Sequence, residues 1–223
     1  MMQDPKLLTL LNVVIDNYIS KWDPVGSKFL NSLEEVDYAP STLRKYLNML
    51  EKAGLVYQPY NSSGRIPTVE WLSEYVSACL QETNSKELVY ETDVGKARTG
   101  LKYLVETTGK VADGVVVWFL RNDEYYYLGI NNLLRDDLMD EYETTRHIVR
   151  FIENKNLIKT LDTKMLQKWQ VYYEFIHDKN AIISCIYSKI TMGWYDGILS
   201  IIGPTRVDYK KNIKIIKKII KTI

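Results

Sequence analysis

The chain has 223 residues, of which 46% are hydrophobic and 26% charged, and its formal net charge is +1. This composition is that of a globular protein with room for two small domains, and it excludes an intrinsically disordered chain. No run approaches the roughly 20 apolar residues of a membrane-spanning helix, and no signal-peptide pattern opens the sequence. The two cysteines lie far apart and predict neither a disulfide nor a zinc site. We therefore expect a cytoplasmic protein with no membrane partner.

The N-terminal third has the pattern of three helices. Apolar residues recur with a helical period over 7–22, and Ser27 is placed to cap a short second helix that runs to about residue 33. A third helix is predicted to begin at Pro40, whose missing N–H costs nothing in a first turn, and to end at Gly54.

A hairpin and a fourth helix follow. The strand-like segment 55–58 leads into a turn-rich loop, and the chain returns through 66–67 before a helix begins near residue 68. The polar stretch 82–86 has the composition of a linker. Three helices followed by a hairpin indicate a winged helix-turn-helix domain, which we assign to residues 1–83.

The third helix has two different faces. At 100° per residue its apolar side chains share one side, and the other side carries Ser41, Arg44, Lys45, Asn48 and Lys52. In a helix-turn-helix protein this helix enters the DNA major groove, where Arg44 can donate to a guanine and Asn48 can bond an adenine edge bidentately. We expect Ser41, Thr42 and Lys45 to position phosphates.

The hairpin loop supplies a second set of candidate DNA-binding residues. They are Ser62, Ser63, Gly64 and Arg65. Hydroxyls, an unobstructed glycine backbone and an arginine charge suit a loop that lies along a phosphate backbone or enters a minor groove. Ser27 and Lys28 of the second helix complete the set. The alternatives are a polar face that is only solvated and a domain that binds a protein instead of DNA.

The net charge of this domain bears on those alternatives. Residues 1–83 carry 7 Lys/Arg against 10 Asp/Glu, a net charge of −3, whereas residues 205–223 carry 7 against 1, a net charge of +6. Any attraction for phosphates therefore has to come from a local face of the N-terminal domain.

Residues 84–223 have a mixed α and β pattern. The predicted elements are, in chain order, a helix over 97–106, a hairpin of strands 115–119 and 125–128, helices over 140–153 and 157–166, strands over 171–176, 181–187 and 198–202, and a Lys/Ile-rich helix over 210–221. We expect this last helix to pack its isoleucines on the sheet. The alternative is contact of its lysines with a membrane surface or with phosphates.

Nothing in the sequence predicts an enzyme. The only histidines are His147 and His177, and neither has a cysteine or carboxylate at a spacing typical of metal ligands or of a catalytic triad. No phosphate-binding glycine loop is present. We expect no catalytic residue, no metal site and no cofactor.

Three blocks of sequence are distinctive. They comprise the N-terminal segments 23–28, 41–44, 50–55, 58–59 and 62–68, a middle segment 128–134 and a C-terminal segment 197–209. These blocks resemble HrcA, the bacterial family of heat-inducible transcription repressors. The resemblance implies an α+β fold, with a GAF-like domain and its antiparallel sheet in residues 84–223. It also implies a homodimer that binds double-stranded DNA at an inverted-repeat operator of heat-shock and chaperone genes, modulated by the GroEL chaperonin.

The chain also departs from the family pattern. Where the family has a histidine, a serine, a glycine and an arginine, this chain has Tyr60, Ala39, Trp71 and Ser73. Between Phe119 and Tyr125 it makes a short turn, where family members carry an inserted dimerisation segment. We therefore expect a shortened member that dimerises through its second domain or through its first and fourth helices.

Two other functions remain open from the sequence. One is a winged-helix regulator of other genes whose second domain senses a small ligand. The other is a protein-interaction module that has lost DNA binding, in keeping with the charge of −3 over residues 1–83.

Overall fold

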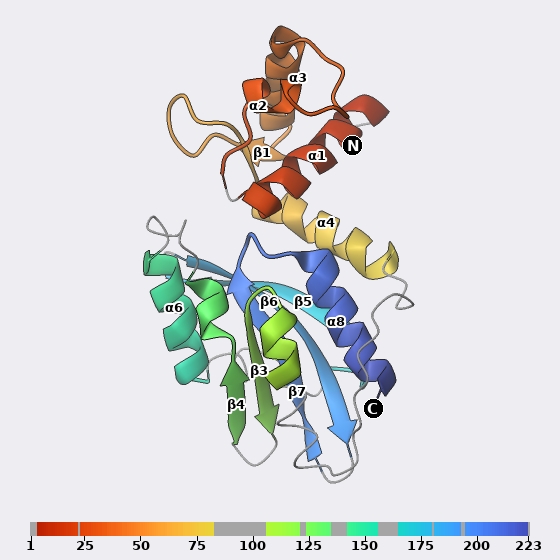
Figure 1. Cartoon of the computed structure of the whole chain (residues 1–223), viewed down its shortest axis with the longest axis vertical. Coiled ribbons are helices and arrows are strands. Elements are labelled where there is room, and N and C mark those ends of the chain that lie inside the picture. The colour runs from red at the N-terminus through yellow and green to blue at the C-terminus, as the bar shows by residue number, and fades with distance from the viewer. Residues whose placement is uncertain are drawn as a thin grey trace. The chain divides into compact units, whose positions relative to one another are not determined.

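A computed structural model describes the chain in eight stretches. They are residues 4–21, 23–82, 106–120, 124–134, 142–155, 165–179, 181–192 and 195–222. The chain forms two compact units, Met1–Tyr75 and Val76–Ile223, and the boundary between them falls within helix α4, Val69–Glu82 (Figure 1). Of the predicted linker, only Glu82 is described, as the last residue of α4. The domain border after residue 83 stays a prediction.

The first unit contains the predicted helices and hairpin. Its elements are α1 (Pro5–Lys21), α2 (Ser27–Asn31), α3 (Pro40–Lys52), β1 (Val56–Tyr57), β2 (Ile66–Pro67) and the first half of α4. Leu11, Ile15 and Leu43 are completely buried in its core, as the helical periodicity predicts. The predicted cap of α2 was wrong by one residue. Gly26 occupies the N-cap position, so Ser27 is the first residue of the helix.

The end of α3 directs the chain into β1. Gly54 has a left-handed backbone with a φ of 71°, its N–H donates to the Glu51 carbonyl at 2.9 Å, and the Leu55 N–H donates to the Leu50 carbonyl at 3.0 Å. These two hydrogen bonds form a Schellman motif, which satisfies carbonyls that the helix end leaves without partners. The glycine predicted to end the helix therefore does so, and β1 begins two residues later.

Backbone hydrogen bonds hold the base of the hairpin on both sides. β1 and β2 pair antiparallel, with Val56 opposite Pro67. On the other side, the backbone N–H and C=O of Arg65 both bond to Val25 at 2.9 Å. We call residues 55–67 the wing. Its position is thereby fixed relative to α3 and to the segment that follows α1.

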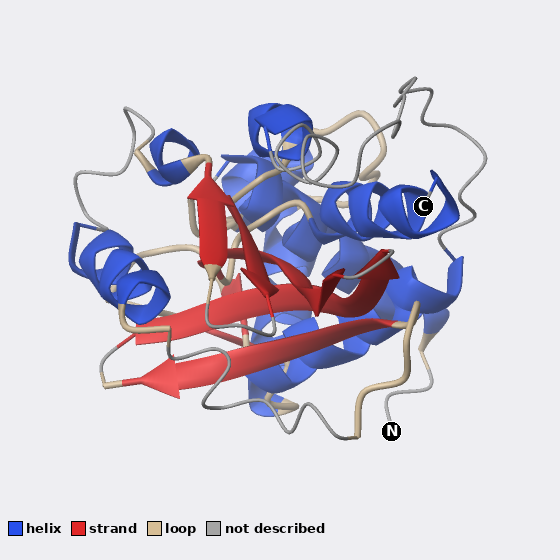
Figure 2. Cartoon of the chain, turned by 90° about the horizontal axis from the view of Figure 1, so that it is seen from below, coloured by secondary structure: helices blue, strands red, loops and turns tan. Residues whose placement is uncertain are grey.

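The second unit is built on a five-stranded antiparallel sheet (Figure 2). In sheet order its strands are β4 (Tyr125–Leu128), β3 (Val115–Leu120), β7 (Tyr195–Pro204), β6 (Ala181–Met192) and β5 (Val171–Asp178). All five strands were predicted, but β6 and β7 are longer than expected. Their ends pair with each other, so tertiary pairing extends them beyond the apolar runs that marked them in the sequence.

Helices pack on both faces of this sheet. Phe151 and Ile152 of α6 (Tyr142–Glu153) join a buried cluster with Phe119 of β3 and Ile176 of β5. Phe175 points to the opposite face, where its ring lies 6.0 Å from that of Tyr209 in α8 (Tyr209–Thr222). Ile213 and Ile216 of α8 are completely buried, and α8 contacts β5 and β6. The last helix therefore packs its isoleucines on the sheet, as expected.

The segment that leads into β3 is held by the middle sequence block, 128–134, and by α8, which begins where the C-terminal block, 197–209, ends. The Asn132 amide, in the 3-10 helix η1 (Ile130–Leu133), donates to the carbonyls of Gly109, Ala112 and Gly114 at 2.9–3.1 Å. Asn212 of α8 is completely buried and bonds both the N–H and the C=O of Asp113, at 2.9 and 2.8 Å. The sequence pattern did not predict η1. The middle block and α8 therefore have a clear structural role in the second unit.

Three predictions fall largely outside the described residues. Of the helix over 97–106 only Glu106 is described, and it is helical along with the residues up to 111. Of the helix over 157–166 only Met165 and Leu166 are described, and neither is helical. The turn between β3 and β4 lies outside the described residues.

Candidate nucleic-acid interface

The polar face of α3 is exposed. Leu43, Leu47 and Leu50 on the opposite face are at most 4% exposed and anchor the helix in the core. The exposed residues are Ser41, Arg44, Lys45, Asn48 and Lys52, and Thr42 is half-buried. The structure therefore exposes the five α3 residues that the helical period places on one face. Of the α2 candidates, Lys28 is exposed and Ser27 is half-buried, and α2 packs against α3.

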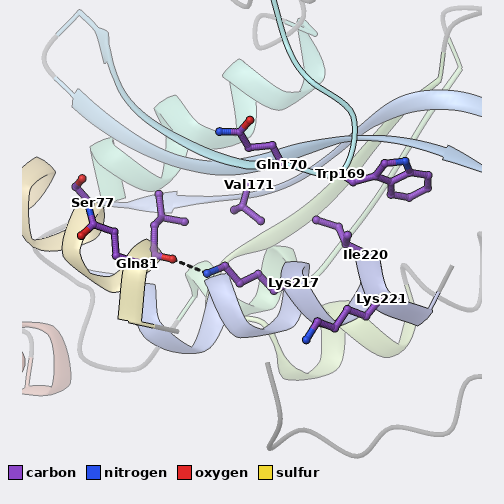
Figure 3. Close-up of a pocket in the computed structure, with 9 residues that line it drawn as sticks. Ser77, Gln81, Trp169, Gln170, Val171, Lys217, Ile220 and Lys221 are labelled. Atoms are coloured by element: carbon purple, nitrogen blue, oxygen red, sulfur yellow. Dashed lines mark hydrogen bonds between the residues drawn. The ribbon is translucent and has the colours of Figure 1, made fainter. Parts of the chain in front are cut away.

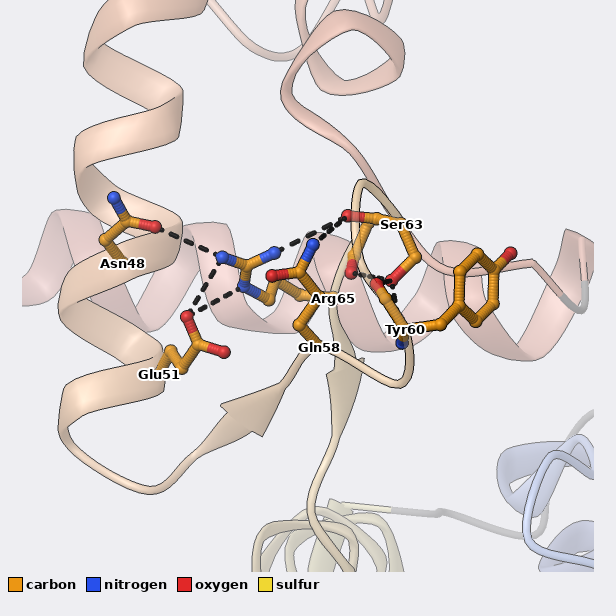
Figure 4. A network of polar contacts seen from close by, with 7 residues as sticks. Asn48, Glu51, Gln58, Tyr60, Ser63 and Arg65 are labelled. Atoms are coloured by element: carbon orange, nitrogen blue, oxygen red, sulfur yellow. Dashed lines mark hydrogen bonds and ion pairs between the residues drawn. The ribbon is translucent and has the colours of Figure 1, made fainter.

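Arg65 lies behind the wing loop and points toward α3. Its side chain is only 13% exposed, and its Nε and Nη2 both approach Oε2 of Glu51, at 3.1 and 2.9 Å (Figure 4). Nη2 also donates to Oδ1 of Asn48 at 3.2 Å, and Nη1 donates to the Ser63 carbonyl at 3.5 Å. The guanidinium thus joins the wing to the exposed face of α3, and its charge is matched by a carboxylate.

Ser63 holds the wing loop together from within. Its hydroxyl donates to the Tyr60 carbonyl at 2.7 Å, and its backbone N–H donates to the same carbonyl at 3.1 Å. The Gln58 amide donates to the Ser63 carbonyl at 3.1 Å (Figure 4). Ser62, in contrast, is exposed at the tip with a φ of 68°. Of the two serines, Ser62 is the one that faces solvent.

Gly64 is closely packed, which differs from the unobstructed backbone expected of it. A Cβ at this position would lie 2.4 Å from both the carbonyl oxygen of Pro24 and the carbonyl carbon of Val25. No real Cβ makes such contacts with backbone atoms, so this close approach requires glycine. The need for glycine at residue 64 thus links two segments of the N-terminal sequence block, 23–28 and 62–68.

Two residues of this surface were missed by the sequence reasoning. Tyr60 is 64% exposed on the wing and borders a pocket of about 440 Å³ that also contacts Phe29 and Lys21. Glu51 holds Arg65, and its place one turn after Asn48 on α3 was the available signal. Because Arg65 offsets Glu51, the exposed cations Arg44, Lys45 and Lys52 dominate the charge of this face of α3.

The second unit has a pocket of about 510 Å³ (Figure 3). Its lining includes Leu80 and Gln81 of α4, Trp169 and Val171 at the start of β5, and Lys217, Ile220 and Lys221 of α8. The Lys217 ammonium donates to the Leu80 carbonyl, near the C-terminal end of α4. Burial and the neighbouring Lys221 lower the pKa of Lys217. The pocket therefore combines aliphatic side chains with two lysines.

Other kinds of site are not formed by the described residues. Within them, no three His, Cys, Asp or Glu side chains gather where a metal ion could bind. His147 lies 3.4 Å from Asp178, a pair that sequence spacing did not reveal. Cys79 and Cys185 are both buried, and neither forms a disulfide. None of the described helices is long and apolar enough to span a membrane.

Comparison with known proteins places the chain in a family. The heat-inducible transcription repressor HrcA of Brevibacillus brevis is 33% identical over 89 residues, which is 40% of this chain and 25% of that protein. The matched part of this chain thus spans a quarter of the curated relative. A crystal structure of a hypothetical protein superposes with a TM-score of 0.78 at 15% identity, covering 99% of this chain and 97% of the other, which shows a shared fold. The family model for the HrcA C-terminal domain matches residues 65–213, more than half of the sequence, so the chain belongs to the HrcA family.

Proposed function

We propose that the chain is a sequence-specific DNA-binding transcription repressor of heat-shock and chaperone genes, acting in the cytoplasm. In this proposal the first unit is a winged helix-turn-helix domain and the second is a GAF-like regulatory and dimerisation domain. The observation that carries the proposal is the exposed polar face of α3, which stands beside a wing fixed at its base. Family membership and the curated repressor relative support the choice of target genes.

The candidate residues have different roles in this proposal. Arg44 is exposed on α3 and donates its guanidinium fork to a guanine in the major groove. Ser41, Thr42 and Lys45 of α3, together with Ser27 and Lys28 of α2, position phosphates. On the wing, the exposed Ser62 contacts the phosphate backbone. The other three wing candidates do not contact DNA in this proposal. They hold the wing in its position, and they are Ser63, Gly64 and Arg65.

The operator of this proposal is an inverted repeat, and the protein binds it as a homodimer. A two-fold operator needs two reading helices related by a two-fold axis. Among the described residues, β4 is an edge strand, and its Tyr126, Tyr127 and Leu128 are 37–45% exposed. An uncharged aromatic edge pairs readily with another strand. We propose that β4 of a second copy pairs antiparallel with this edge, which generates the required two-fold axis.

An electrophoretic gel shift tests the proposed function. The purified protein should bind the inverted repeat upstream of a chaperone operon more tightly than a scrambled duplex of equal length, at several salt concentrations. Equal affinity for the two duplexes contradicts the proposal. Binding of neither duplex favours the protein-interaction module instead. Addition of GroEL to the same assay tests whether the chaperonin modulates binding.

Ligand sensing by the second unit is a second candidate function, with other genes as targets. The observation that favours it is the pocket of about 510 Å³, whose lining includes Lys217 and Lys221 together with Leu80, Val171 and Ile220. This chemistry suits a small carboxylate or phosphate with an apolar part. A screen of such anions by thermal shift tests it, with Lys221→Met as the comparison. A ligand that raises the Tm of both proteins equally does not bind through Lys221.

A further inference from the structure

We infer that the pocket of about 510 Å³ in the second unit binds an aromatic anion, whose ring stacks on Trp169 and whose carboxylate or phosphate lies against Lys217 and Lys221. The inference rests on the second candidate function, ligand sensing by this unit, and deepens it by naming the class of ligand. It does not depend on the DNA-binding surface of the first unit.

The charge of the pocket selects an anion. Lys217 and Lys221 lie one helical turn apart on α8, so both are on the same face of that helix (Figure 3). None of the described residues that line the pocket is acidic. Burial and the neighbouring Lys221 lower the pKa of Lys217, and a bound anion would offset this repulsion between the two ammonium groups. A cationic ligand would add to it.

Lys217 can contact a ligand while it keeps its bond to α4. Its ammonium has three N–H donors, and one of them bonds the Leu80 carbonyl near the C-terminal end of that helix. An anion on Lys217 therefore does not have to displace Leu80. Lys221 is exposed and supplies a second ammonium group. The site thus needs no rearrangement of α4.

Trp169 has a backbone conformation that is unusual for a large side chain. Its φ is 66°, in the left-handed region that bulky residues rarely adopt. The Trp169 N–H donates to the Lys189 carbonyl at 2.9 Å, and Lys168 forms an isolated bridge with the same residue, so the backbone is fixed just before β5. The Trp169 side chain is nevertheless 39% exposed. Strained conformations that the surrounding structure maintains are concentrated at ligand-binding sites.

An aromatic ring is the apolar group that this lining favours. Figure 3 shows the Trp169 ring at the pocket, with Ile220 of α8 and Val171 of β5 as aliphatic neighbours in the lining. Tryptophan gains from an offset-stacked ring beyond the area that is buried, and a saturated ring lacks this gain. A volume of about 510 Å³ is within the range of small-molecule sites. We therefore expect a flat ring system that carries one acidic group.

Isothermal titration calorimetry of the full-length protein tests the inference with four matched probes. 2-Naphthoate and 2-naphthyl phosphate combine the ring with a charge, 2-naphthamide has the ring without the charge, and decalin-2-carboxylate has the charge on a saturated ring. 2-Naphthoate should bind roughly tenfold more tightly than 2-naphthamide, because an ionised group makes the stronger hydrogen bonds. It should bind roughly fivefold more tightly than decalin-2-carboxylate. The affinity of 2-naphthyl phosphate relative to 2-naphthoate then shows which acidic group the lysines prefer.

Two variants assign the ring and the charge to their residues. Trp169→Leu keeps an apolar side chain and should abolish the preference for 2-naphthoate over decalin-2-carboxylate. Lys221→Met should weaken binding of 2-naphthoate roughly threefold and leave binding of 2-naphthamide unchanged. Lys211→Met removes an exposed lysine of α8 that does not line the pocket, so this control should change neither affinity. A merely structural role of Trp169 or Lys221 would lower all affinities together and leave their ratios unchanged.

The outcomes separate this inference from the proposed functions. Equal affinities for 2-naphthoate and 2-naphthamide overturn it, as does the failure of all four probes to bind at millimolar concentration. Ratios that stay unchanged in both variants place the ligand elsewhere and also overturn it. The gel shift on operator DNA tests the repressor function separately, so none of these results affects that function. Binding of 2-naphthoate with the expected ratios, but without any effect on operator affinity, supports the site and contradicts ligand sensing.

Discussion

Arg65 of the wing and Glu51 of α3 form an ion pair across 14 residues of sequence, with two guanidinium nitrogens on a single carboxylate oxygen. A charge that is already matched inside the protein displaces no counterions from DNA. Replacing both residues by methionine should therefore leave the slope of log K against log salt unchanged. Lys45→Met, which removes an exposed cation on the same helix, should reduce it by about 0.9. Fluorescence anisotropy at several salt concentrations measures both slopes. If the slope for the double variant also fell by about 0.9, Arg65 would be a phosphate contact.

Arg44 should contribute base preference as well as charge. Arg44→Ala is expected to cost roughly 1–3 kcal/mol of binding free energy on the operator and to flatten preference at one base pair. Arg44→Lys keeps the charge but loses the planar fork, so it should flatten the same preference while retaining the salt dependence. Competition gel shifts with single-base operator variants measure both effects. Unchanged preference in Arg44→Lys would show that this side chain reads no base.

The contact of Gly64 with Pro24 and Val25 should make this position intolerant of any side chain. Gly64→Ala places a methyl group 2.4 Å from backbone atoms, so either the wing or the segment after α1 has to move. We expect a loss of roughly 1–3 kcal/mol in the free energy of unfolding. Gly26→Ala is the matched control, because its Cβ would meet nothing closer than 3.9 Å. Urea denaturation compares the two, and equal losses would count against this packing.

Asn212 should be important for the stability of the second unit. Asn212→Ala removes both partners of the Asp113 backbone, whose N–H and C=O bond to this amide at 2.9 and 2.8 Å. Each buried polar group left without a partner costs about 1–3 kcal/mol. Lys211→Ala, on the exposed side of the same helix, should change stability little. Thermal denaturation followed by circular dichroism measures both, and a Tm for Asn212→Ala within a degree of the wild type would contradict the prediction.

The proposed dimer can be tested without DNA. Multi-angle light scattering at micromolar concentration should give twice the mass of one 26.0 kDa chain. Tyr126→Lys places a charge on the exposed β4 edge and should shift the protein toward a monomer, because charged side chains discourage pairing of strand edges. Tyr60→Lys, at a more exposed aromatic on the wing, is the control, with 64% exposure against 45% for Tyr126. A wild type that is monomeric with and without operator DNA would contradict the homodimer.

Local patterns predicted the helices and strands well, whereas partners distant in sequence were not predictable. Periodicity placed α1 and α3, and Pro40 and Gly54 marked the ends of α3, because these signals depend on a few adjacent residues. The bond between Arg65 and Asn48 spans 17 residues and depends on where the wing lies against α3. The sequence does not show which atom of a polar side chain on a helix face already has a hydrogen-bond partner within the protein.

The same limit applies to the residues of the wing motif, 62–68. Gly64 and Ser63 were assigned to DNA contact because their residue types suit a phosphate, yet in the structure their atoms are directed at Pro24, Val25 and Tyr60. Glycine and serine serve close backbone packing and turn hydrogen bonds as readily as ligand contact. Residue type alone therefore could not separate these roles.

The Schellman motif at Gly54 has a consequence for how this protein can vary in length. One added residue between α3 and β1 would rotate the wing out of register with Glu51 and separate Arg65 from its partners. The tip near Ser62 is exposed. It lies outside the β1–β2 pairing and outside the bridge between Val25 and Arg65, which hold the wing base. Insertions should therefore be tolerated at the tip and rejected at the helix end, so the tip is the natural place to graft a peptide tag or to lengthen the wing.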